Sequence, residues 1–224
     1  MKLQFLKMVF LLNLLLASTN FTQVAESRKS ILDYYFPETN NKSTFTYLSN
    51  GKQIEMQKVI WFIKDNSNTF ETLEKNTING NIGSIVRNVF RINKNKLEIV
   101  KTISNSALSP GQKIINHNPP EVFLELPQNG KITKWKYESS TGDIYECEAK
   151  MINLNVYEED KVAIVVHKKL ISNGKYHPEF STFEYYVEGL GLLKTQNKDN
   201  IDSMILLEQT YDESVQDYYK TQKK

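Results

Sequence analysis

The sequence predicts an all-β fold, either an antiparallel sandwich or an open barrel, built from two similar halves. Apolar residues alternate with polar ones over most of the chain, as in strands that bury one face. Clusters of Asn, Gly and Asp interrupt these stretches about every 8–12 residues, a spacing typical of antiparallel sheets. In addition, one motif occurs twice, which indicates a duplicated architecture.

The repeated motif is a proline followed by two aromatic residues of one strand and then by a turn. Its members, at a constant offset of 90 residues, are Pro37, Phe45 and Tyr47 in the first copy and Pro127, Trp135 and Tyr137 in the second. A second echo consists of Phe90, Ile92 and Leu97 and of Tyr185, Val187 and Leu192. We therefore expect a single domain over residues 31–211, with halves at 31–103 and 121–211 joined by a connector at 104–120.

The N-terminus has the pattern of a secretory signal. Lys2 and Lys7 flank a short apolar run, and Ala17-Ser18-Thr19 follows it. The run is shorter than the ~20 residues of a membrane-spanning helix. We expect residues 1–19 to be a signal peptide, with no membrane span after its removal and with export to the periplasm, the cell surface or the medium. Residues 20–30 are expected to be a flexible lead and 212–224 a polar tail.

Charge and cysteine content exclude some classes of protein. Without Lys2 and Lys7, basic and acidic residues are equal in number, and no basic stripe occurs, so nucleic-acid binding has no support. The single cysteine, Cys147, excludes an internal disulfide. Because 11% of the residues are aromatic and 40% are hydrophobic, the chain can form an extensive apolar core. No cofactor is predicted.

In the first half, predicted strands alternate with turns. Phe45 and Tyr47 share one face of a strand at 44–48, and Asn50-Gly51 is a hairpin signal because both of its positions need φ > 0. Further strands are expected at 53–63, 70–74, 84–93 and 97–103, with turns at Asn79-Gly80-Asn81 and Lys94-Asn95.

In the second half, a long strand begins at Ile144. Its apolar residues change parity between Met151 and Ile152, which predicts a β-bulge there. After a turn at 158–161, the continuous apolar run Val162–Val166 predicts a strand covered on both faces.

The rest of the second half is expected to contain a hairpin and two more strands. Asn173-Gly174 predicts the hairpin. In the aromatic strand 180–187, Phe183 and Tyr185 are expected to face inward. Gly189 and Gly191 then predict a bulge or a tight bend, and residues 204–207 the last strand.

Part of the second half resembles a known group of proteins. The residues that carry the resemblance are Pro127, Gly130, Trp135 and Tyr137, followed by Tyr185-Tyr186-Val187-Glu188-Gly189-Leu190-Gly191-Leu192-Leu193-Lys194. Over about residues 120–196 this pattern is similar to an uncharacterised family of exported bacterial β-rich proteins with a Pro-…-Gly-…-Trp-x-Tyr strand and a Tyr-x-x-Gly-x-Gly-Leu-Leu-Lys strand. The copy at 35–51 departs from it, since Phe45 replaces the Trp and the early Gly is missing. The resemblance implies an all-β fold in the periplasm or on the cell surface, and it brings no catalytic residues.

Candidates for catalysis or metal binding are few. His117, His167 and His177 lack the spacing of metal ligands, so no metal site is predicted. Cys147 shares its strand parity with apolar residues, which favours a buried and inert thiol. Glu146 and Glu148 lie on one strand face, a pattern more typical of a solvated surface than of a glycosidase cleft.

The aromatic residues are the remaining candidates for a functional site. Those that we expect to line the interior, and to contact a ligand if one binds, are Trp135, Tyr137, Tyr145, Phe183 and Tyr185. The alternative that they only form a core is the more frequent one, because aromatic side chains dominate β cores. We therefore expect a non-catalytic exported envelope or periplasmic protein whose partner is a lipophilic ligand, an extended polypeptide or an envelope protein. The alternatives are an exported hydrolase with a site assembled from separate strands, and a surface adhesion or assembly module.

Overall fold

The computed structural model describes residues 31–35, 42–49, 52–64, 69–106, 109–128, 130–138, 143–199 and 201–211. The predicted signal peptide, lead and polar tail lie outside the described residues, as do Pro37 and the turn Asn50-Gly51. Within the described part of the chain, no helix has the length and apolar character needed to cross a membrane.

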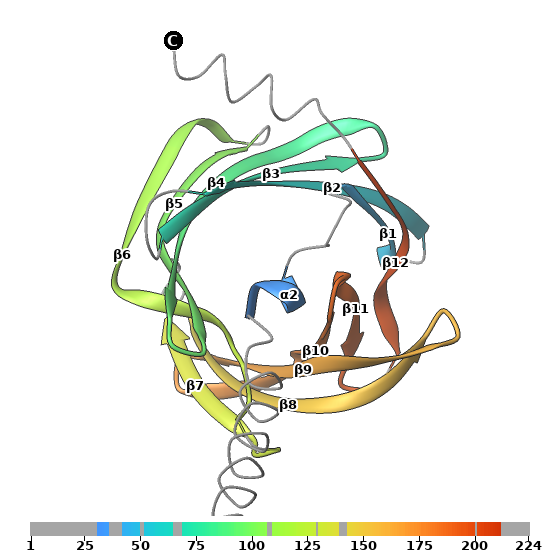
Figure 1. Ribbon diagram of the computed structural model, residues 1–224. Coiled ribbons are helices and arrows are strands. Elements are labelled where there is room, and N and C mark those ends of the chain that lie inside the picture. The colour runs from blue at the N-terminus through green and yellow to red at the C-terminus, as the bar shows by residue number, and fades with distance from the viewer. Residues whose placement is uncertain are drawn as a thin grey trace, which may run out of the picture. The chain divides into compact units, whose positions relative to one another are not determined.

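In the described residues, the fold consists of one short helix and a single twelve-stranded sheet. The helix is α2 (Ile31–Tyr35). The strands are β1 (Lys42–Ser49), β2 (Lys52–Lys64), β3 (Thr69–Ile78), β4 (Asn81–Asn93), β5 (Lys96–Ser106), β6 (Ser109–Glu125), β7 (Thr133–Glu138), β8 (Ile144–Val156), β9 (Glu159–Ser172), β10 (Lys175–Val187), β11 (Gly191–Asn197) and β12 (Asp202–Thr210). The sheet curls into a nearly closed barrel (Figure 1), which confirms the predicted all-β, antiparallel open barrel.

The strand order consists of two meanders. Strands β1 to β6 and strands β7 to β12 each pair with their neighbours in sequence, and β1 pairs with β12 to join the two runs. Strands β6 and β7 are the two ends of the sheet. The motif copies around Phe45 and Trp135 therefore lie on β1 and β7, each the first strand of a meander. That the two halves superpose stays a prediction.

Two-residue loops connect several strands where the sequence carries turn residues. At Asn79-Gly80 and Asn173-Gly174 both residues have positive φ, and Lys94 has φ 57° in the turn Lys94-Asn95. These turns were predicted and are confirmed. The turn expected at 158–161 lies earlier, at Tyr157-Glu158, where two non-glycine residues have φ of 52° and 67°.

The connector predicted at 104–120 is wrong. Strand β5 continues to Ser106, and β6 begins at Ser109 and pairs with β5 up to Lys96 opposite Glu125. The prolines that suggested irregular structure, Pro119 and Pro120, are accommodated because β6 is an edge strand that pairs on one side. The register shifts between Ile99 and Lys101, opposite this proline pair.

The β-bulge predicted at Met151 is also wrong. Strand β8 pairs with β9 in unbroken register from Ile144 to Val156. Met151 packs against the main core, whereas Ile152 packs against a second cluster that contains Ala163 and Val187. The apolar residues of β8 change from one strand face to the other because its two faces pack against different cores. The same arrangement accounts for the burial of the run around Ala163 on both faces, as predicted.

The glycine pair after β10 forms the predicted bend. Gly189 and Gly191 have φ of 75° and 71°. The register of β10 with β11 shifts where Tyr185 is opposite Lys194 and Tyr186 is opposite Leu192, so Leu193 is an extra residue. This bulge and turn place the chain against α2, because the backbone N–H of Gly189 donates to the carbonyl oxygen of Asp33 at 2.7 Å.

Candidate functional site

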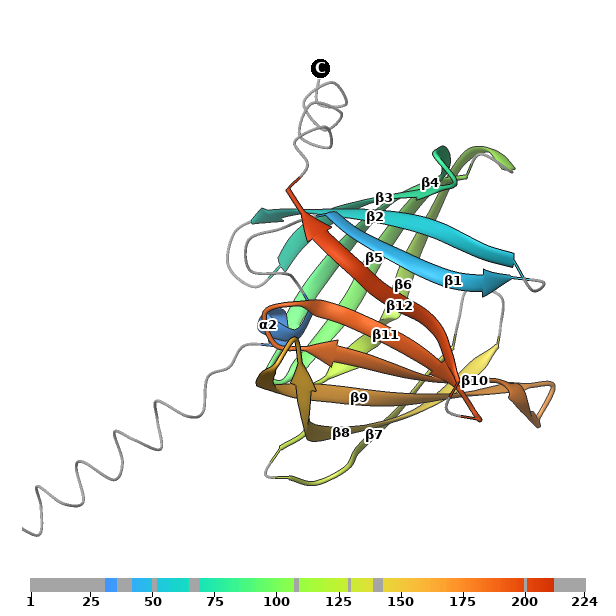
Figure 2. The same cartoon turned by 90° about the vertical axis from the view of Figure 1, so that its right-hand side faces the viewer.

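Helix α2 fills one end of the barrel. It lies within the ring of strands in Figure 1 and at one end of the barrel, beside the β10–β11 turn, in Figure 2. Ile31, Tyr34 and Tyr35 are all buried. A helix of five residues has almost no stability of its own. Its position therefore depends on the contacts that these three side chains make with the barrel.

Tyr35 makes the most specific of these contacts. Its ring lies 5.4 Å from that of Phe90 and 5.1 Å from that of Phe123, tilted to one and edge-on to the other. Its hydroxyl donates to Oε1 of Glu74 at 3.0 Å, and Oε2 of Glu74 lies 3.1 Å from Nζ of Lys58. Burial, and then the negative charge of Glu74, raise the pKa of Tyr35 well above its ordinary value, so the phenol is neutral.

A second polar group lies on the opposite wall. Nζ of Lys168 is 2.8 Å from Oε2 of Glu184, which also accepts the hydroxyl of Tyr186 at 2.7 Å. Burial alone lowers the pKa of Lys168, but the attraction of Glu184 outweighs it and the pKa is raised. The ammonium group also lies over the ring of Phe123 at 5.3 Å. Phe123 thus separates this pair from Tyr35.

A third polar group extends along β6. Nδ1 of His117 is 3.2 Å from Glu121, and its Nε2 is 3.0 Å from the hydroxyl of Thr102, which donates to Asn88. Burial lowers the pKa of His117, so the imidazole is neutral at pH 7. Burial raises the pKa of Glu121, opposed by the positive charge of Lys168.

A small space remains beside α2. It is lined by Tyr35, Lys58, Phe123, Tyr186 and Leu192, among others, and has a volume of about 30 Å³. That is room for a water molecule or two, whereas sites for small organic ligands have roughly 300–1,000 Å³. With α2 in place, this space is therefore too small for such a ligand.

Three of the five residues predicted to line the interior do so. Trp135 is buried in the main core, and its indole N–H donates to the carbonyl oxygen of Val122 at 2.9 Å. Tyr137 packs against the same core and stacks on Tyr145, with ring centroids 5.0 Å apart. None of them lines the space beside α2. A ligand-binding role for them stays a prediction.

The other two residues, Phe183 and Tyr185, face the opposite way. Their neighbour Tyr186 belongs to the main core, and successive residues of a strand point to opposite faces. Phe183 stacks on His167 at 4.2 Å, and the hydroxyl of Tyr185 donates to Gln196 at 2.5 Å. The expected inward orientation is wrong because aromatic residues occupy both faces of β10, so alternation alone did not identify the inner one.

The sequence reasoning missed the polar residues of the interior. Lys168 follows Ile164 and Val166 at the same parity, and Glu184 shares its parity with Tyr186. For both residues, the available signal was a charged side chain on a strand face that also carries apolar residues. Glu74 and α2 had no comparable signal, because their contacts join distant parts of the chain.

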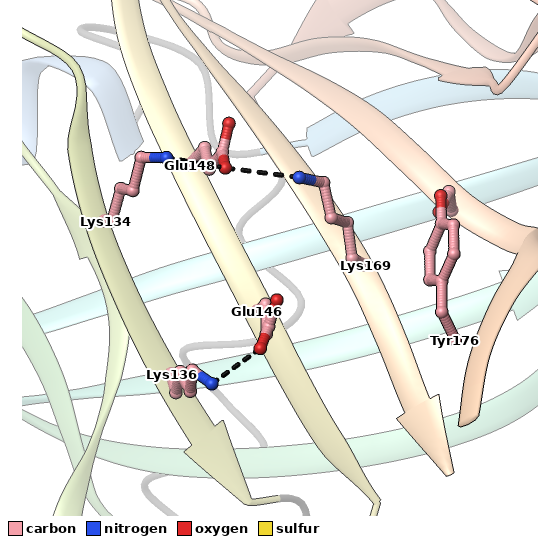
Figure 3. A network of polar contacts seen from close by, with 7 residues as sticks. Lys134, Lys136, Glu146, Glu148, Lys169 and Tyr176 are labelled. Atoms are coloured by element: carbon pink, nitrogen blue, oxygen red, sulfur yellow. Dashed lines mark hydrogen bonds and ion pairs between the residues drawn. The ribbon is translucent and has the colours of Figure 1, made fainter. Parts of the chain in front are cut away.

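The carboxylates predicted to form a solvated face do so on the outer surface. Figure 3 shows Glu148 on β8 between Lys134 of β7 and Lys169 of β9, at 3.0 and 3.2 Å. Glu146 pairs with Lys136 at 2.6 Å. Hydrogen bonds from the lysines lower the pKa of both carboxyl groups.

The remaining candidates for chemistry are inert or isolated. The thiol of Cys147 is 1% exposed, and burial raises its pKa to about 12. Within the described residues, no cluster of three or more His, Cys, Asp or Glu side chains could hold a metal ion.

Comparison with known proteins yields little similarity. No family model matches the sequence, and no curated protein matches it. Among solved structures, the chain is similar to a Bacteroides fragilis protein described as exported, with a YmcC-like fold. The two are 10% identical, the match covers 77% of this chain and 96% of the other, and the TM-score is 0.38. A likeness at this level supports no inference about activity.

Proposed function

We propose that the chain is an exported, non-catalytic protein of the periplasm or cell surface that binds a lipophilic ligand in the end of the barrel filled by α2. The observation that carries this proposal is the nature of the filling. A five-residue helix, and not strand side chains alone, contributes the ring that packs against Phe90 and Phe123. A segment without stability of its own can be exchanged for a ligand of similar shape.

The state of the interior polar groups favours binding over hydrolysis. A nucleophile needs a base within reach that is free to take its proton. Glu74 and Glu184 each accept a tyrosine hydroxyl and also pair with a lysine. The thiol of Cys147 keeps its proton at neutral pH. These groups are arranged to neutralise one another, which suits an exported carrier better than an exported hydrolase.

Export is tested by the mass of the secreted protein. If residues 1–19 are a signal peptide, the intact mass of the exported protein lacks at least the first 17 residues. A full-length mature chain would contradict export through this segment.

Ligand binding is tested with N-phenyl-1-naphthylamine, a neutral apolar fluorophore. We expect saturable binding at one site, tighter in Ile31→Ala than in the wild type, because the substitution weakens the packing of α2 and hence its competition with the probe. Ile205→Ala, on the exposed face of β12, is the control and should bind as the wild type does. Folded proteins that show no saturable binding in any of the three would exclude the proposal.

A second candidate function follows from the sheet edge. The first part of β6 pairs with β5 only, and Ile114 on this edge is 53% exposed. An unpaired edge can add an extended polypeptide strand, as in adhesion or assembly modules. Linear peptides selected from a displayed library on this protein should then lose binding in Ile114→Pro, which removes a backbone N–H, and keep it in Ile132→Ala.

A further inference from the structure

We infer that the ligand carries a neutral hydroxyl group on an apolar body, as a substituted phenol does, and that it takes the place of Tyr35 at Glu74. The inference rests on the proposed function and specifies the ligand class for that same site.

The contacts of Tyr35 define what the site recognises. Two phenylalanine rings contact the aromatic body, and a carboxylate that is only 9% exposed accepts the hydroxyl at 3.0 Å. An apolar ligand without a donor would leave Glu74 with one partner fewer in a buried position, which is unfavourable. Recognition therefore requires a donor at the end of the apolar body.

The charge of the site selects a neutral donor. Glu74 is already balanced by Lys58, whose Nζ lies 3.1 Å from the other carboxylate oxygen. A ligand carboxylate would place a second negative charge beside Glu74, and a ligand ammonium would bury an excess positive charge. A hydroxyl donates to Glu74 and leaves the charges balanced.

The apolar part of the ligand has a place to extend. The space of about 30 Å³ next to Tyr35 is also lined by Phe45, Ile60 and Leu192. Removal of α2 side chains enlarges this space toward the end of the barrel. A short alkyl chain on the aromatic ring can therefore follow the wall formed by these residues.

The test compares three probes that share a body and differ in their head group: 4-butylphenol, butylbenzene and 4-butylbenzoate. Binding is measured by calorimetry on Tyr35→Ala, which vacates the position of the phenol. We expect 4-butylphenol to bind about ten-fold or more tightly than butylbenzene, as for a hydrogen bond to a charged group, and the benzoate to bind most weakly. In Tyr35→Ala/Glu74→Leu the preference for the phenol should disappear.

Two further variants control for folding and for unspecific cavities. Tyr35→Phe keeps the ring and loses the hydroxyl that donates to Glu74, so 4-butylphenol should bind it more tightly than the wild type and keep its preference. Met151→Ala removes an interior side chain of β8, whereas Glu74 lies on β3, and it should show no preference among the probes beyond that of the wild type.

The outcomes separate the inference from the proposed function. Equal affinity for 4-butylphenol and butylbenzene, or tightest binding of the benzoate, would overturn the inference and leave a lipophilic ligand in place. Absence of binding by all three probes in folded Tyr35→Ala and Tyr35→Phe would contradict both.

Discussion

The barrel has two seams between its six-strand meanders, and they are joined in different ways. At the first seam, β1 and β12 form an antiparallel pair from Lys42 opposite Thr210 to Tyr47 opposite Met204, with one register shift between Thr44 and Phe45. At the second, β6 and β7 form no backbone pair among the described residues. There the indole of Trp135 donates to the carbonyl oxygen of Val122, so a side chain supplies the hydrogen bond that a strand would otherwise provide.

The difference shows that nearness in sequence does not ensure pairing. Strands β1 and β12 are far apart in the chain and pair, whereas β6 and β7 are consecutive and do not. Pro119 and Pro120 remove two backbone donors from β6. The chain after β6 is also held elsewhere, because the N–H of Leu126 donates to the carbonyl of Asn95 at 2.8 Å. Side-chain packing therefore closes the second seam.

The largest expected effect is at Trp135, the residue that closes the second seam. Trp135→Ala should lower the free energy of unfolding by about 3–5 kcal/mol, as expected for a buried aromatic side chain, because both packing and the bond to Val122 are lost. Urea denaturation measures this change. Trp135→Phe keeps a ring and should lose less, about 1–3 kcal/mol. An unchanged midpoint in Trp135→Ala would mean that the side chain does not close the seam.

The matching substitution at the first seam is Leu206→Ala. Leu206 is buried opposite Phe45, and its truncation should lower the free energy of unfolding by about 2–5 kcal/mol. Hydrogen exchange distinguishes the seams. The amides of β1 should stay protected in Leu206→Ala because the backbone ladder remains, whereas those of β7 should lose protection in Trp135→Ala. Loss of protection in β1 would show that both seams depend on side chains.

The pH dependence of the free energy of unfolding tests whether water reaches the hydroxyl of Tyr137 at the second seam. Burial is the main cause that raises the pKa of Tyr137 above 10.0 in the folded protein. The stabilisation by its neutral form is therefore complete below pH 10 and is lost as the pH rises toward the folded-state pKa. The free energy of unfolding should fall less between pH 9 and pH 11 in Tyr137→Phe than in the wild type. Identical slopes would indicate that water reaches the hydroxyl.

The smallest effect is expected on the outer face beside the second seam. Lys134→Ala removes one of the two lysines on Glu148, and should lower the free energy of unfolding by at most about 1 kcal/mol, since exposed ion pairs contribute little. The difference from the wild type should vanish at 1 M NaCl because salt screens the pair. Lys150→Ala, at an exposed position of the neighbouring strand β8, is the control. A loss of several kcal/mol would show that outer-face charges also hold the seam.

Local patterns in the sequence were sufficient for most of the strands and several of their turns, although not for β6. Period-2 alternation identified the antiparallel fold, and Asn173-Gly174 identified a hairpin, because positive φ at both positions is a local requirement. The bend at Gly189 and Gly191 was predicted from two glycines that follow an aromatic strand. Trp135 was expected in the interior because aromatic side chains dominate β cores, and it is buried there.

Only the tertiary structure decided which face of each strand is the inner one and what fills the barrel. Alternation defines two faces but does not say which is buried, so the structure was needed to place Tyr186 inside and Tyr185 outside. The bulge expected at Met151 was wrong because a second apolar cluster covers the outer face. The site at Tyr35 and Glu74 joins residues 39 positions apart, and no local pattern encodes such a contact. Likewise, in the described part of the chain, β6 and β7 stay unpaired because the chain after β6 is held elsewhere, and only the folded chain decides between such distant pairings.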